Sequence, residues 1–152
     1  MQRKYIATIL INFSIALLAI NCSGTRPSDL GVNSNGMLKE CPSSPNCVSS
    51  FCEPTDEHYL APISYTTSTA EAKQQLLKVI ESSDRTEIVV DSDNYIHAEY
   101  TSKLMRYVDD VEFYFDDKTK KLHFRSASRL GKSDFGVNRE RIETIQSKLG
   151  WK

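Results

Sequence analysis

Basic, hydroxyl, amide and acidic side chains are concentrated in one stretch of the chain, residues 125–143 (RSASRLGKSDFGVNRERIE). Arginine binds carboxylate or phosphate through paired hydrogen bonds, and the free N–H groups at the start of a helix attract anions. The stretch covers a predicted strand end, a loop and a predicted helix start, which could converge on a small anionic or polar ligand such as a lipid head group or a cell-wall fragment. The predicted ligand-binding residues are His97, Glu99, Arg125, Arg129, Asp134, Asn138 and Arg139.

The same residue types also have a structural interpretation. Glu112 and Arg125 would form a cross-strand pair. Asp134 would cap a turn, and Arg139 would pair with Glu143 one helical turn later. Charged residues near the ends of elements are usually solvated or paired with one another. The sequence leaves both interpretations open.

Two other classes of function are an enzyme and a protein-interaction module. His97 and Glu99 would share one strand face as base and helper, with Ser126 or Ser128 as nucleophile. No Gly-x-Ser-x-Gly motif, phosphate-binding loop or metal-binding histidine pair accompanies them. We therefore predict no catalytic residue, no metal and no cofactor, and the sequence does not indicate an enzyme. An interaction module of the cell envelope would present its sheet edge or the loop 41–50 to a partner protein.

The cysteines predict one disulfide bond. Cys41 and Cys47 flank Pro-Ser-Ser-Pro-Asn, whose turn-forming residues would bring the two sulfurs together. The alternative is a zinc site made of Cys41, Cys47, Cys52 and His58, which an oxidising compartment disfavours. With the disulfide formed, Cys52 is left over as a buried or spare thiol.

The first two dozen residues resemble a bacterial export signal. Arg3 and Lys4 precede a mostly apolar run at 5–20, which is shorter than the about 20 residues of a membrane-spanning helix. Cys22 follows Leu-Ala-Ile-Asn and resembles the lipid-acceptor cysteine of bacterial lipoproteins. Ser23 after it resembles the signal for transfer to the outer membrane. An ordinary secretory signal or an uncleaved anchor is the alternative.

These patterns divide the chain into a signal peptide of the lipoprotein type at 1–21, a flexible tether at 22–40 and one domain at 41–152. We expect a protein of the bacterial cell envelope, lipid-anchored and facing the periplasm from the outer membrane. Removing residues 1–21, which carry two basic residues and no acid, would change the net charge from −1 to −3. A slightly acidic chain is not typical of nucleic-acid binding. The expected partners are the membrane, through the lipid, and a small anionic ligand or an envelope protein.

Two helix patterns bracket two hairpin patterns. The first helix begins with a capping box, Ser68 to Glu71, and continues with an apolar stripe. The last helix is expected from about Asn138 to Leu149, with Gly150 as its C-terminal cap. The β-rich segments between the helices are 86–91, 94–102, 109–115 and 121–128. This order predicts a single α+β domain in which two helices pack on one face of an antiparallel sheet of about four strands.

The second hairpin also has a predicted register. A symmetric turn near residues 118–119 would place Phe113 opposite Phe124 and Glu112 opposite Arg125. The first hairpin has two possible registers. A two-residue turn would place His97 on the face of Ile88 and Val90, and a three-residue turn would place Ile96 and Ala98 there.

Five short motifs occur in order along the chain: the cysteine loop at 41–50, His-Ala-Glu at 97–99, Asp-Asp-Val-Glu-Phe at 109–113, Arg-Ser-Ala-Ser-Arg at 125–129, and Gly-Val-Asn-Arg at 136–139 continued by Arg-Ile-Glu. Together with Gly131 and Asp134 they resemble the family called domain of unknown function 1499, from Met37 to about Leu149. Cys52 is an addition to the pattern. The resemblance implies an envelope-associated bacterial domain, with relatives in plastids, and no established reaction.

Overall fold

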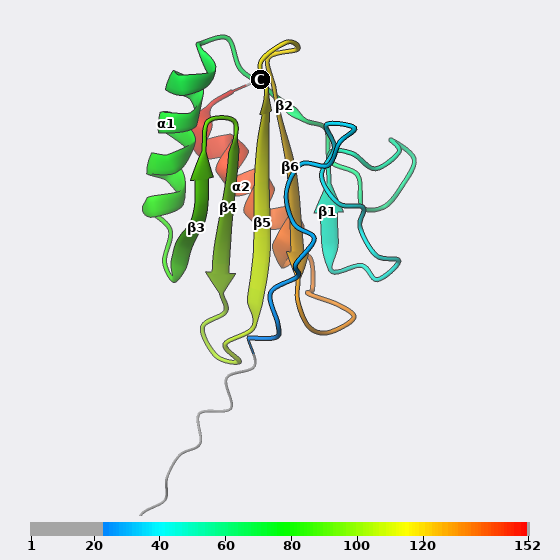
Figure 1. The fold of residues 1–152 in the computed structure, drawn as a ribbon. Coiled ribbons are helices and arrows are strands. Elements are labelled where there is room, and N and C mark those ends of the chain that lie inside the picture. Colours follow the sequence, from blue (N-terminus) through cyan, green and yellow to red (C-terminus); the bar gives the residue numbers. More distant parts are fainter. Residues whose placement is uncertain (1–22, 152) are drawn as a thin grey trace, which may run out of the picture.

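Six strands form one antiparallel sheet in the computed structural model, which describes residues 23–151. The strands are β1 (Cys47–Ser49), β2 (Ile63–Ser64), β3 (Thr86–Ser92), β4 (Tyr95–Thr101), β5 (Val108–Asp116) and β6 (Lys121–Ser128). Their order is β1-β6-β5-β4-β3, and β2 also pairs with β6 (Figure 1). The predicted α+β class is confirmed, but the count of about four strands is wrong. β1 and β2 are three and two residues long, too short to show an alternating pattern.

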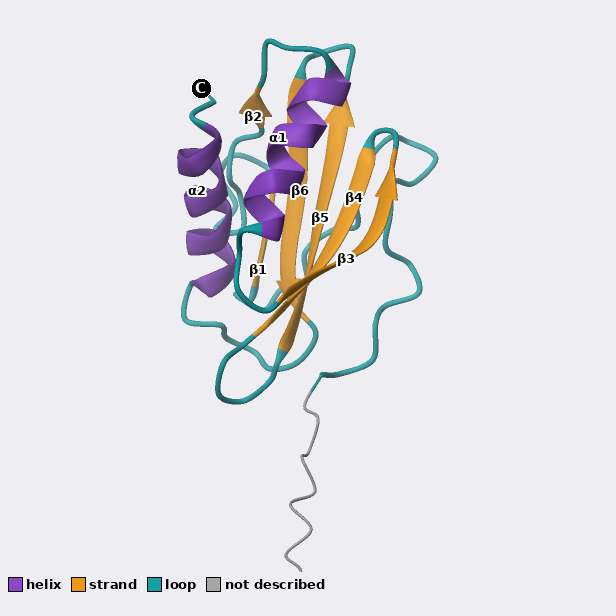
Figure 2. Ribbon diagram, turned by 90° about the vertical axis from the view of Figure 1, so that its left-hand side faces the viewer, coloured by secondary structure: helices purple, strands orange, loops and turns teal. Residues whose placement is uncertain are grey.

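Two helices cover one face of this sheet, as predicted (Figure 2). Helix α1 (Thr69–Glu81) begins with the capping box of Ser68 and Glu71. Helix α2 (Val137–Leu149) begins one residue earlier than expected and ends at Gly150, whose left-handed backbone (φ 66°) caps it. The predictions for the signal peptide and for Cys22 fall outside the described residues.

The registers explain which side chains share a face. The predicted pairs Phe113–Phe124 and Glu112–Arg125 are both present in the β5–β6 hairpin. In the β3–β4 hairpin the turn has two residues, because Ser92 lies opposite Tyr95, but the register shifts between Ile88 and Val90. Because of this β-bulge, each of the two predicted registers holds for part of the hairpin.

The face covered by the helices carries the apolar core, and we call it the helix face. Side chains of β4, β5 and β6 meet the buried side of both helices there. The largest fully buried apolar side chains on this face include Phe113, Phe115, Phe124, Leu76 and Ile142. Burial of these apolar side chains is the main source of the stability of the fold. The apolar pattern of the sequence predicted this packing of helices on the sheet.

The opposite side of the sheet carries His97, Glu99, Asp110, Glu112 and Arg125, and we call it the polar face. The sequence predicted a flexible tether at 22–40, but residues 23–40 lie across this face (Figures 1 and 2). Leu38 is 1% exposed, and the Gly31 N–H donates a hydrogen bond of 2.7 Å to Glu112 Oε1. Glu112 is therefore completely buried.

Candidate functional site

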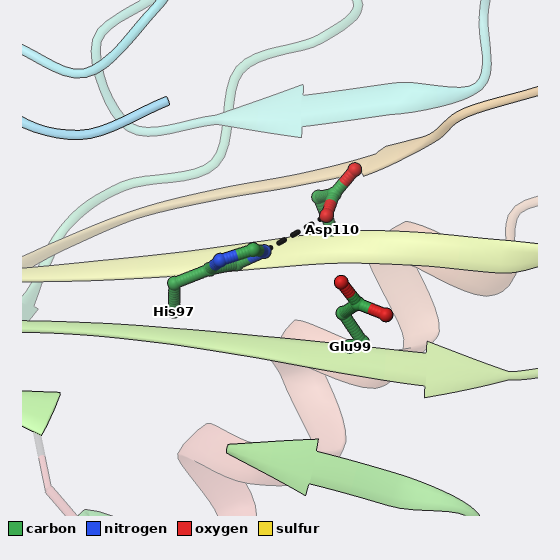
Figure 3. A group of neighbouring side chains, drawn as sticks. All are labelled: His97, Glu99 and Asp110. Carbon is green, nitrogen blue, oxygen red and sulfur yellow. Dashed lines mark hydrogen bonds and ion pairs between the residues drawn. The ribbon is translucent and has the colours of Figure 1, made fainter. Parts of the chain in front are cut away.

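Four charged or titratable side chains form a continuous network on the polar face. His97 and Glu99 project from β4 and Asp110 from β5 (Figure 3). His97 Nε2 lies 2.8 Å from Asp110 Oδ1. Arg129 Nη2 donates to Asp110 Oδ1 at 2.6 Å and to Glu99 Oε1 at 2.5 Å. Arg26, from the N-terminal segment, also forms an ion pair with Glu99.

The network keeps the buried Asp110 carboxylate ionised. Burial alone would raise the pKa of Asp110, but hydrogen bonds from Arg129 and His97 outweigh burial and lower that pKa to about 2. The same bond to Asp110 raises the pKa of Arg129. Ligand atoms of His97, Glu99 and Asp110 lie within 4.8 Å of one another, a spacing that suits a metal ion. In this network, however, the positive charge between the two carboxylates is supplied by Arg129.

A second buried charge pair continues the polar face. Arg125 Nη1 lies 3.4 Å from Glu112 Oε2, so the predicted cross-strand pair is present. Glu112 also accepts hydrogen bonds from the Tyr95 hydroxyl (2.9 Å) and from Gly31. Burial, followed by the nearby Glu112 charge, raises the pKa of Tyr95. Arg125 is 5% exposed, and its Nε atom has no hydrogen-bond partner among the described residues.

The hydroxyl groups proposed as nucleophiles lie on the other side of the sheet. Ser126 Oγ donates to Asn138 Oδ1 at 2.6 Å, and Asn138 Nδ2 donates to Ser128 Oγ at 3.0 Å. Both contacts are on the helix face, whereas His97 faces the N-terminal segment. The sheet therefore separates His97 from both serines, and the proposed base–nucleophile pair cannot form.

Asn138 is the centre of a polar cluster that connects the cysteine loop at 41–50 with the stretch 125–143. It is fully buried, and its Nδ2 also donates to the Asn46 carbonyl at 3.1 Å and to Asp134 Oδ2 at 2.7 Å. Asp134 accepts from the backbone N–H of Gly136 and of Asn138 as well. The predicted turn-capping role of Asp134 is therefore present, and its carboxylate occupies the N–H groups at the start of α2.

A hollow of about 260 Å³ lies beside this cluster. Its lining includes Pro45, Cys47 and Val48 from the cysteine loop and Ser133, Gly136 and Arg139 from the later motif. Arg139 Nη2 donates to the carbonyl groups of Glu57 (2.6 Å) and Tyr59 (3.2 Å). The predicted pair of Arg139 with Glu143 is absent among the ion pairs of the described residues.

His58 also lines the hollow. Its Nδ1 lies 2.6 Å from Asp56 Oδ1 and its Nε2 lies 3.1 Å from the Ser44 carbonyl oxygen. A carboxylate and a carbonyl can only accept hydrogen bonds, so both ring nitrogens must donate, which requires the protonated ring. Burial lowers the pKa of His58, but the bonds to Asp56 and Ser44 outweigh it and raise the pKa.

The predicted disulfide bond between Cys41 and Cys47 is present, with the sulfurs 2.06 Å apart. The alternative zinc set is excluded, because two of its four ligands are joined as a disulfide and His58 is bound to Asp56 and Ser44. Cys52 is free and half-buried, and burial raises the pKa of its thiol.

The predicted ligand-binding residues thus fall into separate places. His97, Glu99 and Arg129 share one network, and Arg125 pairs with Glu112 beside it. Asp134, Asn138 and Arg139 lie around the start of α2, where Asp134 and Arg139 line the hollow and Asn138 is buried behind it. The sheet separates the first group from Asn138, so the seven residues do not form one site.

Sequence reasoning missed Asp110 and Asn46. Asp110 lies directly opposite Glu99 in the β4–β5 pairing, so extending the hairpin registers by one strand would have brought it to the network. Asn46 Nδ2 donates to the Gly131 carbonyl at 2.9 Å, across 85 residues of sequence. Sequence reasoning also missed Arg141, whose Nη2 donates a hydrogen bond to Asp109 Oδ2 at 2.6 Å.

Comparisons with known proteins address the family but not the reaction. Among the described residues, no helix has the length and apolar character needed to cross a membrane. No curated protein and no solved structure matches this chain. The model of one family, described as protein of unknown function (DUF1499), matches residues 37–149. The matched part contains every strand and both helices, and the chain belongs to the DUF1499 family.

Proposed function

We propose that this chain is a non-catalytic, lipid-anchored domain of the bacterial cell envelope that binds a small anionic or polar ligand in the hollow beside Arg139. One observation supports this proposal above the others. Two polar motifs about 90 residues apart are joined by Asn46 and Asn138 and enclose a hollow of about 260 Å³. A hollow of this size suits a carboxylate, a phosphate or a single sugar-sized group.

The donors in the hollow favour an acceptor-rich ligand. Arg139 uses Nη2 for two backbone carbonyls, and its Nε and Nη1 make no hydrogen bond among the described residues. The Nε–H and Nη1–H groups can each donate a charge-assisted hydrogen bond to an oxygen of a carboxylate or phosphate. Two of the acids nearby are engaged, since Asp134 accepts from Gly136 and Asn138 and Asp56 binds His58. Glu57 also lines the hollow, and its carboxylate forms no ion pair among the described residues.

The polar face supports a structural role for the remaining predicted residues. His97 is 2% exposed and Asp110 is 2% exposed, and His97 Nε2 and both Asp110 carboxylate oxygens are used within the network. A buried network in which the charges are paired contributes to a unique fold without contacting a ligand. The proposed binding site is therefore the hollow alone.

Native mass spectrometry of the protein purified from its own cells tests this function. We expect a small copurifying anion in the wild type that is lost in Arg139→Ala. In titrations with inorganic phosphate and with acetate, the NMR signal of the Arg139 Nε–H group should shift. Arg85→Ala is the matched control, because Arg85 is an exposed arginine that also binds a backbone carbonyl, that of Thr101.

Binding that survives in Arg139→Ala, or is lost equally in Arg85→Ala, would contradict the proposal. An unliganded wild type that copurifies with a second envelope protein would favour the interaction-module alternative. Turnover of ester or phosphate substrates that His97→Ala abolishes would contradict the non-catalytic role.

A further inference from the structure

Exposed apolar side chains gather at one end of the sheet. Eight large hydrophobic residues are exposed among the described residues, and six of them lie in two neighbouring segments, 102–107 and 129–137. We call these two segments the tip. The six residues are Leu104, Met105, Tyr107, Leu130, Phe135 and Val137. Because such residues are normally scattered over a soluble surface, this concentration indicates a contact surface.

The two segments of the tip are adjacent in space. The first connects β4 to β5, and the second connects β6 to α2. β5 and β6 are paired up to Asp109 and Ser128, and just beyond that pair the Arg129 N–H donates to the Val108 carbonyl at 3.1 Å. Both connections therefore lie at the lower end of the sheet in Figure 1, opposite the C-terminus.

The tip is also basic. Lys103, Arg106 and Lys132 are exposed and form no ion pair among the described residues. The one acid in the two segments is Asp134, whose carboxylate binds the start of α2. Exposed cations between apolar and aromatic side chains are typical of surfaces that lie on an anionic bilayer.

Two bulky residues of the tip have backbone conformations that their side chains disfavour. Phe135 has φ 56° and is 97% exposed, and Arg106 has φ 58°. The left-handed region is uncommon for residues other than glycine, asparagine and aspartate. The Phe135 ring makes almost no contact with the rest of the domain, so packing within the domain does not account for it.

The described chain also begins at the tip. Gly24 lies so close to the second segment that a Cβ atom there would come within 2.9 Å of Arg129 Cβ and 3.0 Å of Leu130 Cγ. Residues 1–22, with the apolar run at 5–20 and the predicted lipid-acceptor Cys22, directly precede this point in the sequence. A lipid on Cys22 would be attached two residues before Gly24.

We propose that the tip is a membrane-docking surface, which lays this end of the domain on an anionic phospholipid bilayer. Leu104, Met105 and Phe135 would enter the interface between head groups and acyl chains. Lys103, Arg106 and Lys132 would contact lipid phosphates. The apolar and basic side chains carry this inference without the lipid on Cys22, and it is independent of the ligand proposed for the Arg139 hollow.

Quenching of tryptophan fluorescence by brominated lipid tests this orientation. The chain has one tryptophan, Trp151, at the end of the domain opposite the tip, and it serves as an internal control. The full chain would be reconstituted into vesicles of phosphatidylethanolamine and phosphatidylglycerol brominated on its acyl chains. We expect strong quenching of the indole introduced by Phe135→Trp and little quenching of Trp151.

Variants of the basic residues and of Phe135 distinguish docking of the tip on the bilayer from attachment through the lipid on Cys22 alone. Replacing Lys103, Arg106 and Lys132 together with glutamine should remove the quenching at position 135, as should vesicles made only of phosphatidylcholine brominated on its acyl chains. Phe135→Gly should keep or raise the melting temperature, because glycine tolerates the positive φ at this position. In the same variant, a fluorescent label attached to the tip should lie farther from the lipid. That combination would not arise if Phe135 had only a role in folding.

Several results would overturn the proposal. These are equal quenching at position 135 and at Trp151, quenching at position 135 that persists in the glutamine variant, and a full chain that stays free of the vesicles. The tip could instead bind a second copy of the chain. Sedimentation of the detergent-solubilised protein as a dimer that Phe135→Ser dissociates would also overturn it.

Discussion

The helix face and the polar face of the sheet are both buried, but different interactions hold them. The Phe113 and Phe124 side chains on the helix face belong to the apolar core, whose burial is favourable without any partner of fixed geometry. One residue away in β5, Glu112 is equally buried and depends on Arg125, Tyr95 and Gly31. The polar face is therefore stable only while every partner is present and correctly charged.

The largest expected effect is on the helix face. Phe113→Ala removes a completely buried ring and should lower the free energy of unfolding by about 4 kcal/mol, from lost burial and the cavity left behind. Urea unfolding measured by circular dichroism checks this value. Val90→Ala is the control, since Val90 is 41% exposed, and it should cost less than about 1 kcal/mol. Similar losses in both variants would mean that the helix face does not dominate stability.

The second prediction removes one cation, Arg129, from the polar face. Arg129→Met leaves Asp110 and Glu99 without Arg129, and the free energy of unfolding should fall by about 3 kcal/mol. The loss is caused by unpaired charge rather than by lost volume. Arg129→Met combined with Asp110→Asn and Glu99→Gln should therefore recover most of it. If the triple variant is no more stable than Arg129→Met, the polar face is held by packing instead.

The third prediction concerns acid. The pKa of Asp110 is lowered from an ordinary value of 3.8 to about 2 in the folded protein. Its contribution to stability is therefore present above pH 4 and is lost as the pH falls through about 2. The loss amounts to roughly 2 kcal/mol. Unfolding measured between pH 5 and pH 2 should show this decline, and Asp110→Asn should show a shallower one. Parallel curves would contradict the pairing.

The smallest effect comes from a single hydroxyl on the polar face. Tyr95→Phe removes the hydrogen bond to buried Glu112 and should cost about 1 kcal/mol, because the carboxylate loses one of its donors. Tyr114→Phe is a matched control, since Tyr114 lies opposite Tyr95 in the β4–β5 pairing and its hydroxyl makes no hydrogen bond among the described residues. Thermal melts of both variants test this, and equal melting temperatures would contradict it.

Much of the fold could be predicted because its signals are local. The capping box of Ser68, the Gly150 cap and the pairing of Phe113 with Phe124 each depend on a few neighbouring residues. The short strands β1 and β2 depend on β6 for their existence. Residues 23–40 are polar, with few apolar side chains apart from Leu38, so their composition resembled that of a spacer. Their position on the sheet results from individual contacts with distant residues, which no local pattern reports.

The candidate site was less predictable than the fold. The residue types were identified correctly, but charged side chains can pair with one another or with a ligand, and sequence spacing does not distinguish the two outcomes. In the structure His97 binds Asp110, and Arg129 binds both Asp110 and Glu99. Arg139 differs because its contacts are backbone carbonyls, and it forms no ion pair within the described part of the chain.

The β-bulge in β3 has a consequence for molecules that are crowded together on a surface. β3 ends the strand order of the described sheet, so its outer N–H and C=O groups are available to a neighbouring chain. Edge strands of this kind promote aggregation between copies, and a bulge opposes it by twisting the edge. The interruption between Ile88 and Val90, with Glu87 and Asp91 beside it, would therefore help neighbouring copies to remain separate at high local concentration.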